Sequence, residues 1–154
     1  MRIYLVQHGQ AKSEDIDPDR RLTEKGIADV TKISRFLKDA GLHVDVIWPS
    51  GKARAAQTAD ILATGIVSSQ GIIRHDGLAP NDDIGHIKDE LLQKETDVMI
   101  VGHLPFLSKL ASSLISGSES AGTIVFQQGG VVCMESNENK IWQLLWMIVP
   151  KLLP

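Results

Sequence analysis

Three short apolar runs, each followed by a turn and then by a helical pattern, constrain the fold of this chain most strongly. They cover residues 3–6, 44–48 and 97–101. Runs of this length are typical of buried strands, and their alternation with helices predicts a parallel sheet with helices on both faces. Ligands in such folds bind beyond the carboxyl ends of the strands, where His8 and His103 stand. A site at that edge of the sheet is therefore expected.

Apolar residues at helical spacing predict four helices, over residues 22–41, 53–63, 84–92 and 104–114. Asp83 precedes the third helix as a candidate N-cap, and Pro105 suits the first turn of the fourth. Further strands are expected at residues 71–73, 124–126, 131–135 and 141–149, with a hairpin turn at 137–139. The chain is therefore predicted to form one domain, residues 1–154, of class α/β. Its three α/β/α layers enclose a mixed, mostly parallel central sheet.

Composition argues against several classes of protein. The chain has 154 residues, 43% of them hydrophobic, which suffices for one core. Its net charge of -3 argues against a nucleic-acid binder. The apolar run at residues 141–149 is too short to span a bilayer, and we interpret residues 1–6 as a strand rather than a signal peptide. We therefore expect a cytoplasmic protein without membrane contact, and we interpret its single cysteine, Cys133, as a core thiol.

The residues at the predicted strand ends suit phosphoryl transfer. His8 follows the first apolar run, and His103 lies between the third run and a helix. Arg54 falls in the first turn of the helix after the second run, where backbone N–H groups and the helix dipole favour an anion. Each residue alone is weak evidence, because such residues are usually structural. Together they predict a site in which one imidazole attacks phosphorus and cationic groups stabilise the oxygens.

Four segments of the sequence carry a resemblance to a known family. They are His8-Gly9, Arg21-Leu-Thr-Glu-Lys-Gly26, Arg54-Ala-Ala-Gln-Thr-Ala59 and Gly102-His103-Leu-Pro105. In order and spacing they resemble the signature segments of the histidine phosphatase superfamily, and within it those of the SixA-type phosphohistidine phosphatases. The resemblance extends over nearly the whole chain and implies a phosphoglycerate mutase-like fold.

The resemblance also implies roles for individual residues. His8 is expected to become transiently phosphorylated, while Arg54 and His103 hold the transferring phosphoryl group. The residues expected to contact the substrate are Gln7, Gly9 and, at the pocket rim, Arg20. No metal or cofactor is expected. For attack, His8 must present an unprotonated ring nitrogen while its other nitrogen is held as a donor, whereas His103 is more useful protonated.

Two positions depart from the family pattern. Where the family has an arginine before the nucleophile, this chain has Gln7, which keeps hydrogen-bond donors but loses the charge and the bidentate fork. Loss of one preorganised donor at such a site can lower the rate by about 100- to 1,000-fold, unless Arg20, Lys12 or Lys52 compensates. Gly51 stands where a proline is common, which loosens the turn without removing a reacting group.

No residue is an obvious general acid. Asp82 and Asp83 are the nearest candidates, and we interpret both as N-capping residues. A phosphohistidine substrate needs an acid less than an ester does, because imidazole is a far better leaving group than an alkoxide. The short span between residues 63 and 97 also leaves little material to close over a ligand. The sequence therefore favours a hydrolase of signal transduction that acts on protein phosphohistidine, for example on a histidine phosphotransfer domain.

Three other functions stay open at this point. Gln7 permits a catalytically impaired protein that binds a phospho-ligand without turnover. A general small-molecule phosphatase of the same family is the enzymatic alternative. A metal hydrolase is the third, because ligand-type side chains gather in one part of the sequence, namely His75, Asp76, Asp82, Asp83 and His86. A polar loop leading into a solvated helix explains that group more simply.

Overall fold

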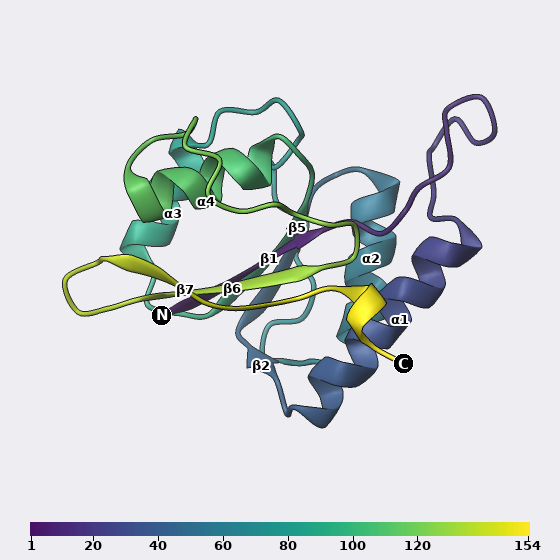
Figure 1. Cartoon of the computed structure of the whole chain (residues 1–154), viewed down its shortest axis with the longest axis horizontal. Helices are drawn as coiled ribbons and strands as arrows, with labels where there is room; N and C mark the ends of the chain where they lie inside the picture. Colours follow the sequence, from purple (N-terminus) through teal and green to yellow (C-terminus); the bar gives the residue numbers. More distant parts are fainter.

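The structure is a computed structural model that describes residues 1–154. Five strands form the central sheet (Figure 1): β1 (Arg2–Gln7), β3 (Val46–Pro49), β5 (Val98–Gly102), β6 (Val131–Ser136) and β7 (Trp142–Ile148). Their order across the sheet is β3-β5-β1-β6-β7. β1, β3 and β5 run parallel, β6 runs antiparallel to β1, and β7 runs antiparallel to β6. The sheet is therefore mixed and mostly parallel, as predicted.

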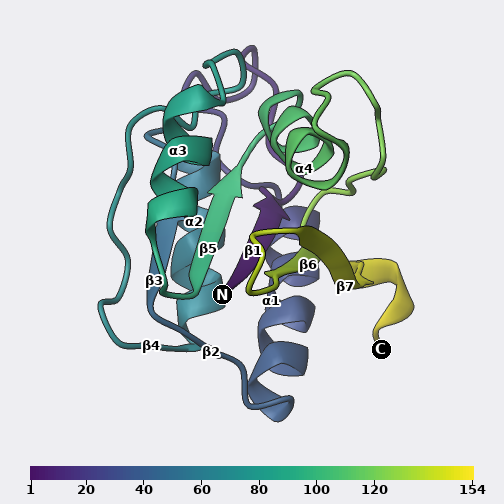
Figure 2. The same ribbon diagram turned by 90° about the vertical axis from the view of Figure 1, so that its left-hand side faces the viewer.

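Four helices cover the two faces of this sheet: α1 (Glu24–Asp39), α2 (Ala53–Ala63), α3 (Gly85–Gln93) and α4 (Phe106–Ser116). α1 and α2 pack on one face, and α3 and α4 on the other (Figure 2). Side chains alternate along β1, so Tyr4 and Val6 pack with the first pair of helices while Ile3 and Leu5 pack with the second. The predicted three-layer α/β/α class is therefore confirmed.

The carboxyl ends of the three parallel strands meet at one edge of the sheet. β1 ends at Gln7, which pairs with Gly102, the last residue of β5. β3 ends at Pro49, which pairs with Val101, the residue before Gly102. The residues that follow these strands are His8, Ser50 and His103. Segments far apart in the sequence therefore leave the sheet next to each other, as we expect for this class of fold.

The predicted strand at residues 44–48 is divided in two. Asp45 lies at the break, and its carboxylate accepts the N–H of Asp97 at 2.7 Å. The first part belongs to β2 (His43–Val44), which pairs with β4 (Val67–Ser68) in a separate two-stranded sheet. β4 has two residues and is partly polar and exposed. It therefore lacks the apolar run by which a strand is found in a sequence.

The strands predicted at residues 71–73 and 124–126 are wrong. The first segment contributes only a single bridge, between Ile72 and Ile47. The second has no regular structure, and Phe126 is buried in the core on the side of α4. One side chain of a short apolar run can thus enter the core without strand pairing, and periodicity does not distinguish the two cases.

The last two helices begin slightly later than predicted. α3 begins at Gly85, whose N–H donates to Oδ1 of Asp83 at 2.6 Å. α4 begins at Phe106, and Pro105 occupies the N-cap rather than the first helical position. None of the helices combines the length and the apolar character that crossing a bilayer requires.

A hairpin joins β6 to β7 at the predicted place. Oδ1 of Asn137 accepts the N–H of Ile141 at 3.0 Å, and a short 3-10 turn, η1 (Pro150–Leu152), follows β7. Cys133 lies on β6 and is fully buried, and burial raises the pKa of its thiol to about 11. The interpretation of Cys133 as a core residue is confirmed.

Candidate active site

His8 stands directly beyond β1, and its imidazole is oriented by one short contact. The backbone N–H of His8 donates to the carbonyl of Gly102 at 3.0 Å, which extends the pairing of β1 with β5. Nδ1 of His8 lies 2.7 Å from the carbonyl oxygen of Gly9. Because a carbonyl only accepts, Nδ1 must carry the proton and Nε2 must present its lone pair. This is the ring state that a nucleophile needs.

Gly9 supports this geometry by close packing. A Cβ at this position would lie 2.9 Å from Cγ2 of Val30 and 3.1 Å from the carbonyl oxygen of Gly26, so a glycine is required against α1. The N–H of Gly9 donates to Oγ1 of Thr58 at 3.1 Å, and that hydroxyl donates to the carbonyl of Arg54 at 2.8 Å. Both polar backbone groups of Gly9 are therefore used within the protein, and its contact with substrate stays a prediction.

Arg54 and His103 lie next to the His8 ring. Arg54, on the first turn of α2, places Nε 3.3 Å from Nε2 of His8. The centroid of the His103 ring lies 5.1 Å from that of His8. Nε2 of His103 is 2.6 Å from Oγ of Ser50, and this hydroxyl also accepts the N–H of Lys52 at 3.3 Å. We call His8, Arg54 and His103 the central cluster; the structure brings them together, and their catalytic roles stay predictions.

The pKa values of both histidines in the central cluster are lowered. At His8 burial is the main cause, opposed by the ring's hydrogen bond to a carbonyl and reinforced by the charges of Arg54 and Arg20. Burial also lowers the pKa of His103 to about 3, with further contributions from His8, Arg54, Lys52 and Arg20. His103 is therefore neutral at pH 7, which corrects the expectation that it is protonated. The sequence identifies neighbouring cations but not the depth to which a ring is buried.

We expect the His103 ring to stay neutral in the free protein from about pH 8 to about pH 5, because burial keeps its pKa far below the ordinary value of 6.5. Inorganic phosphate should raise that pKa, since a bound anion stabilises the imidazolium. NMR spectra of the histidine rings, assigned with His103→Ala, measure both effects. A midpoint near 6.5 without phosphate would contradict the burial of this ring.

The same shift has a defined sign for stability. Between about pH 3 and pH 6.5 the unfolded chain binds a proton at His103 that the folded chain does not bind. The free energy of unfolding therefore falls as the pH is lowered through this window. Urea unfolding at about pH 7 and about pH 4 should show a larger loss of stability for the wild type than for His103→Ala.

Gln7 and the three cations that could compensate for the missing arginine occupy different surroundings. Gln7 is the last residue of β1, and its Oε1 is buried without a hydrogen-bond partner. Arg20 is half-buried, and its charge lowers the pKa of every member of the central cluster, so it lies near the site. The charge of Lys52 reaches the His103 ring. Lys12 contributes its carbonyl, which accepts from Nε of Arg20 at 3.2 Å.

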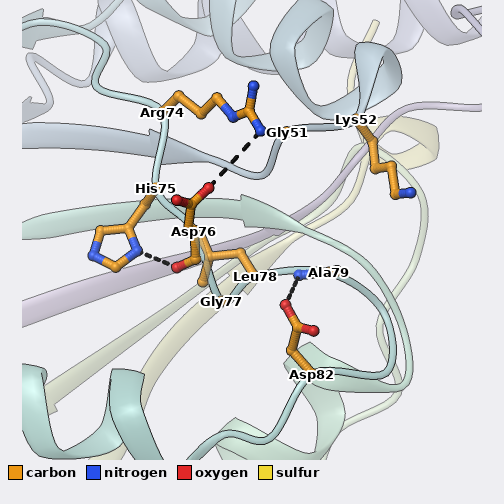
Figure 3. A pocket seen from close by; sticks show the side chains of 9 residues that line it. All are labelled: Gly51, Lys52, Arg74, His75, Asp76, Gly77, Leu78, Ala79 and Asp82. Atoms are coloured by element: carbon orange, nitrogen blue, oxygen red, sulfur yellow. Dashed lines mark hydrogen bonds and ion pairs between the residues drawn. The ribbon is translucent and has the colours of Figure 1, made fainter.

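An open pocket of about 240 Å³ begins at Gly51 and Lys52, directly after Ser50 (Figure 3). It is lined by residues 51, 52, 74–79 and 82. The guanidinium of Arg74 lies over Gly51, where a Cβ would come within 2.6 Å of Nη2. The glycine that departs from the family pattern therefore leaves room for this side chain.

Asp82 and Asp83 both accept from backbone N–H groups of their own loop. Oδ2 of Asp82 accepts from Ala79 at 2.9 Å (Figure 3), and Oδ1 of Asp83 accepts from Gly85. The N-cap of α3 is instead Ile84, which makes no side-chain cap, so the interpretation of Asp82 and Asp83 as N-capping residues is wrong. Each carboxylate is nevertheless committed to a local hydrogen bond.

The side chains considered as metal ligands do not assemble. His75 instead contacts Glu90, with Nε2 at 2.9 Å from the carboxylate, and its ring packs on Trp48. Arg74 pairs with Asp76 at 3.8 Å (Figure 3). The chain has no group of three or more His, Cys, Asp or Glu side chains placed to hold a metal ion. This contradicts a metal site in residues 75–86.

Sequence reasoning assigns no supporting role to three side chains that the structure shows in one. They are Ser50, Gln57 and Thr58. Oε1 of Gln57 accepts the N–H of Leu22 at 2.7 Å, which ties the approach to α1 to α2. Thr58 lies one helical turn after Arg54 and is fully buried. A polar residue four positions after Arg54 on a buried helix face could have indicated a supporting role for Thr58. Hydrophobic periodicity alone treats such a position as a packing residue.

Known proteins resemble this chain in sequence and in structure. An uncharacterized protein of Picosynechococcus sp. is 29% identical over 158 residues, which cover 94% of this chain and 95% of the relative. Among solved structures, the protein histidine phosphatase SixA complexed with tungstate superimposes with a TM-score of 0.86 at 21% identity, over 98% of each chain. A protein of Agrobacterium tumefaciens assigned as the phosphohistidine phosphatase SixA superimposes with a TM-score of 0.78 at 25% identity, over 97% of each chain.

The shared fold does not identify a substrate, whereas the sequence match identifies a family. The alpha-ribazole phosphatase of Shigella flexneri shares the fold as well, with a TM-score of 0.71 at 17% identity over 97% of each chain, so the fold alone does not identify the substrate. The family pattern of the histidine phosphatase superfamily (branch 1) matches residues 3–79, which include His8 and Arg54. With half of its residues matched and the same fold throughout, the chain belongs to the histidine phosphatase superfamily, branch 1.

Proposed function

We propose that this protein is a SixA-type phosphohistidine phosphatase that removes phosphate from a histidine of a partner protein. The observation that carries the proposal is the ring state of His8. Nδ1 is held by the Gly9 carbonyl, and Nε2 presents its lone pair 3.3 Å from Nε of Arg54. A nucleophile and a guanidinium suited to phosphate therefore meet at one point.

The proposed reaction has two steps. In the first, Nε2 of His8 attacks phosphorus, and the bond from phosphorus to the substrate imidazole breaks. The substrate ring, protonated on its other nitrogen, leaves as neutral imidazole. In the second step water attacks the same phosphorus, the bond to Nε2 breaks, and phosphate leaves with the oxygen of that water. Arg54 stabilises charge on the phosphoryl oxygens in both steps, and His103 joins it once the bound anion has raised the pKa of its ring.

The state of the nearby carboxylates supports phosphohistidine over an ordinary phosphate ester. An alkoxide leaving group requires a proton from a well-placed acid. Asp82 and Asp83 are each hydrogen-bonded to backbone N–H groups of their loop. A phosphoramidate nitrogen that is already part of a protonated imidazole needs no such acid.

The small amount of chain around the site supports a substrate carried on a protein. Between α2 and β5 the chain forms β4, a loop that includes the pocket residues 74–79 and 82, and α3. No larger insertion is present there to enclose a small ligand. We therefore propose a phosphohistidine-bearing domain, such as a histidine phosphotransfer domain, as the partner. In this proposal residues 1–154 act as one domain and use no metal or cofactor. The protein works in the cytoplasm, in signal transduction.

A second candidate is a protein that binds a phosphorylated ligand without turning it over. The observation that favours it is Gln7, which brings no charge to the site and whose Oε1 has no partner. A small-molecule phosphatase, the remaining alternative, would use the same central cluster on a different substrate.

The proposed function predicts release of inorganic phosphate from a phosphohistidine protein, with a higher kcat/KM than for a phosphoserine peptide. Release should persist in excess EDTA, because Arg54 supplies the positive charge that a metal would otherwise provide. The carrier incubated alone controls for spontaneous hydrolysis. Phosphate binding without release would favour the binding protein. Loss of release in EDTA, restored by one metal, would favour a metal hydrolase.

Gln7→Arg is expected to strengthen phosphate binding and to raise kcat/KM on a simple phosphate ester by about 10-fold or more. The reason is that the Gln7 Oε1 makes no hydrogen bond that an arginine would break, while Arg20 is held by the Lys12 carbonyl. Gln70→Arg, which adds the same charge at an exposed position, is the matched control. A fall in kcat/KM on both an ester and a phosphohistidine protein would show that Arg20 already fills the space.

A further inference from the structure

Arg20 adopts a backbone conformation that arginine normally avoids. Its φ is 51°, in the left-handed region, and Lys140 is the only other residue besides glycine with a positive φ. The Cβ of an L-residue makes this region unfavourable, so the surrounding structure must hold Arg20 there. Arg20 lies in the loop between β1 and α1, and this loop projects from the body of the protein (Figure 1).

The side chain of Asp17 provides that restraint. Its Oδ1 accepts the N–H of Asp19 at 3.1 Å, and its Oδ2 accepts the N–H of Arg21 at 3.2 Å, so it binds the residues on both sides of Arg20. The backbone carbonyl of Asp17 accepts the N–H of Arg20 itself at 2.8 Å. Asp17 is buried, and its hydrogen bond with the Arg21 side chain lowers the pKa of the carboxyl to about 2. The carboxylate is therefore an ionised acceptor at any assay pH.

The turn fixed by Asp17 sends the Arg20 side chain back toward the strand ends. Nε of Arg20 donates to the carbonyl of Lys12 at 3.2 Å, and the N–H of Lys12 donates to the carbonyl of Arg21 at 2.8 Å. Lys12 and Arg21 thus pair at the base of the loop. Lys12 lies only four residues after His8 in the sequence. The guanidinium of Arg20 lies at this base rather than in solvent.

We infer that Asp17 is a positioning residue: by holding Arg20 in the left-handed turn, it keeps the Arg20 guanidinium beside the central cluster, where it adds positive charge to that of Arg54. This inference rests on the proposed function for the identity of the ligand. Arg20 binds the phosphoryl oxygens, and Asp17 acts only through Arg20.

The first test separates stored backbone strain from an ordinary loop. Arg20→Gly removes the conformational penalty together with the guanidinium, so the urea midpoint should rise or stay level while inorganic phosphate binds about 10- to 100-fold more weakly. Lys140→Gly is the matched control at the other left-handed position, in the exposed β6–β7 hairpin; it should leave phosphate binding unchanged. A lower urea midpoint for Arg20→Gly, or unchanged phosphate binding, overturns the inference.

The second test is a double-mutant cycle on Asp17 and Arg20, with the dissociation constant of inorganic phosphate as readout. Each single change to alanine should weaken binding by about 10- to 100-fold, and the double variant should bind no more weakly than Arg20→Ala. Additive losses would show that Asp17 acts elsewhere and overturn the inference. Arg21→Ala, which removes an exposed partner of Asp17 but keeps the backbone contacts, should bind phosphate like the wild type.

One substitute variant and one comparison with the wild type complete the test. If Asp17→Ala does not fold, Asp17→Asn retains an acceptor oxygen, and the same cycle with Arg20→Ala must again be non-additive. Failure of the proposed function is distinguishable, because it appears as no phosphate release by the wild type from a phosphohistidine protein. Phosphate affinity still tests Asp17 in that case. Conversely, a wild type that releases phosphate and an Arg20→Ala variant with unchanged affinity would overturn only the inference.

Discussion

His8→Ala is expected to abolish the phosphoenzyme and to lower turnover of a phosphohistidine protein by about 10⁴-fold or more. Nε2 is the ring nitrogen that carries the lone pair, because Nδ1 donates to the Gly9 carbonyl, and Nε of Arg54 donates to this lone pair at 3.3 Å. Brief incubation with a labelled phosphoryl donor, followed by acid and base treatment, measures the effect. The wild type should retain a label that is labile in acid and stable in base.

Binding and chemistry should separate in this variant. His8→Ala leaves Arg54 and His103 in place, so inorganic phosphate should still bind while turnover is lost. His43→Ala, at an exposed histidine of β2, is the matched control and should keep both label and turnover. A label that persists in His8→Ala would assign the nucleophile to another residue.

Arg54→Lys is expected to be nearly as damaging as Arg54→Ala, with a loss of about 100- to 1,000-fold in kcat/KM for each. A lysine keeps the charge but offers a point ammonium instead of a planar fork that can form two parallel hydrogen bonds to phosphate oxygens. It also cannot reproduce the contact from Nε to the ring of His8, which in this structure spans 3.3 Å.

The Arg54 variants need a control for the general effect of exchanging these residues. Arg35→Lys makes the same exchange at an exposed position of α1 and should leave kcat/KM unchanged. Steady-state kinetics on a phosphohistidine protein measure all three variants. Near-normal kcat/KM in Arg54→Lys would place Arg54 outside the phosphate-binding shell, whatever the result for alanine.

The position of the central cluster could be predicted because it depends on strand ends. His8 and His103 follow short apolar runs, and parallel strands end at a common edge. The ring state of His8 could be required on chemical grounds, but its cause, the Gly9 carbonyl, depends on a backbone orientation that no residue type encodes. The neutral state of His103 could not be predicted, since it follows from burial by elements distant in the sequence.

Other features were beyond the sequence for different physical reasons. In the run at residues 124–126, Phe126 enters the core without strand pairing while Val125 is exposed, and apolar character alone does not distinguish these roles. The left-handed backbone of Arg20 is set by contacts from Asp17, so propensity gives no sign of it. Ser50 contacts His103 across two strands, a pairing visible only after the sheet is assembled.

The burial of Cys133 bears on how the protein responds to oxidants. Phosphatases that attack with a cysteine thiolate lose activity when peroxide converts that thiolate to a sulfenic acid. Here the only thiol is inside the sheet, its pKa is raised to about 11, and the proposed nucleophile is an imidazole. Dephosphorylation by this protein should therefore continue under oxidative stress. A signal carried on phosphohistidine would then be ended at the same rate in reducing and oxidising conditions, while signals ended by thiolate phosphatases would persist.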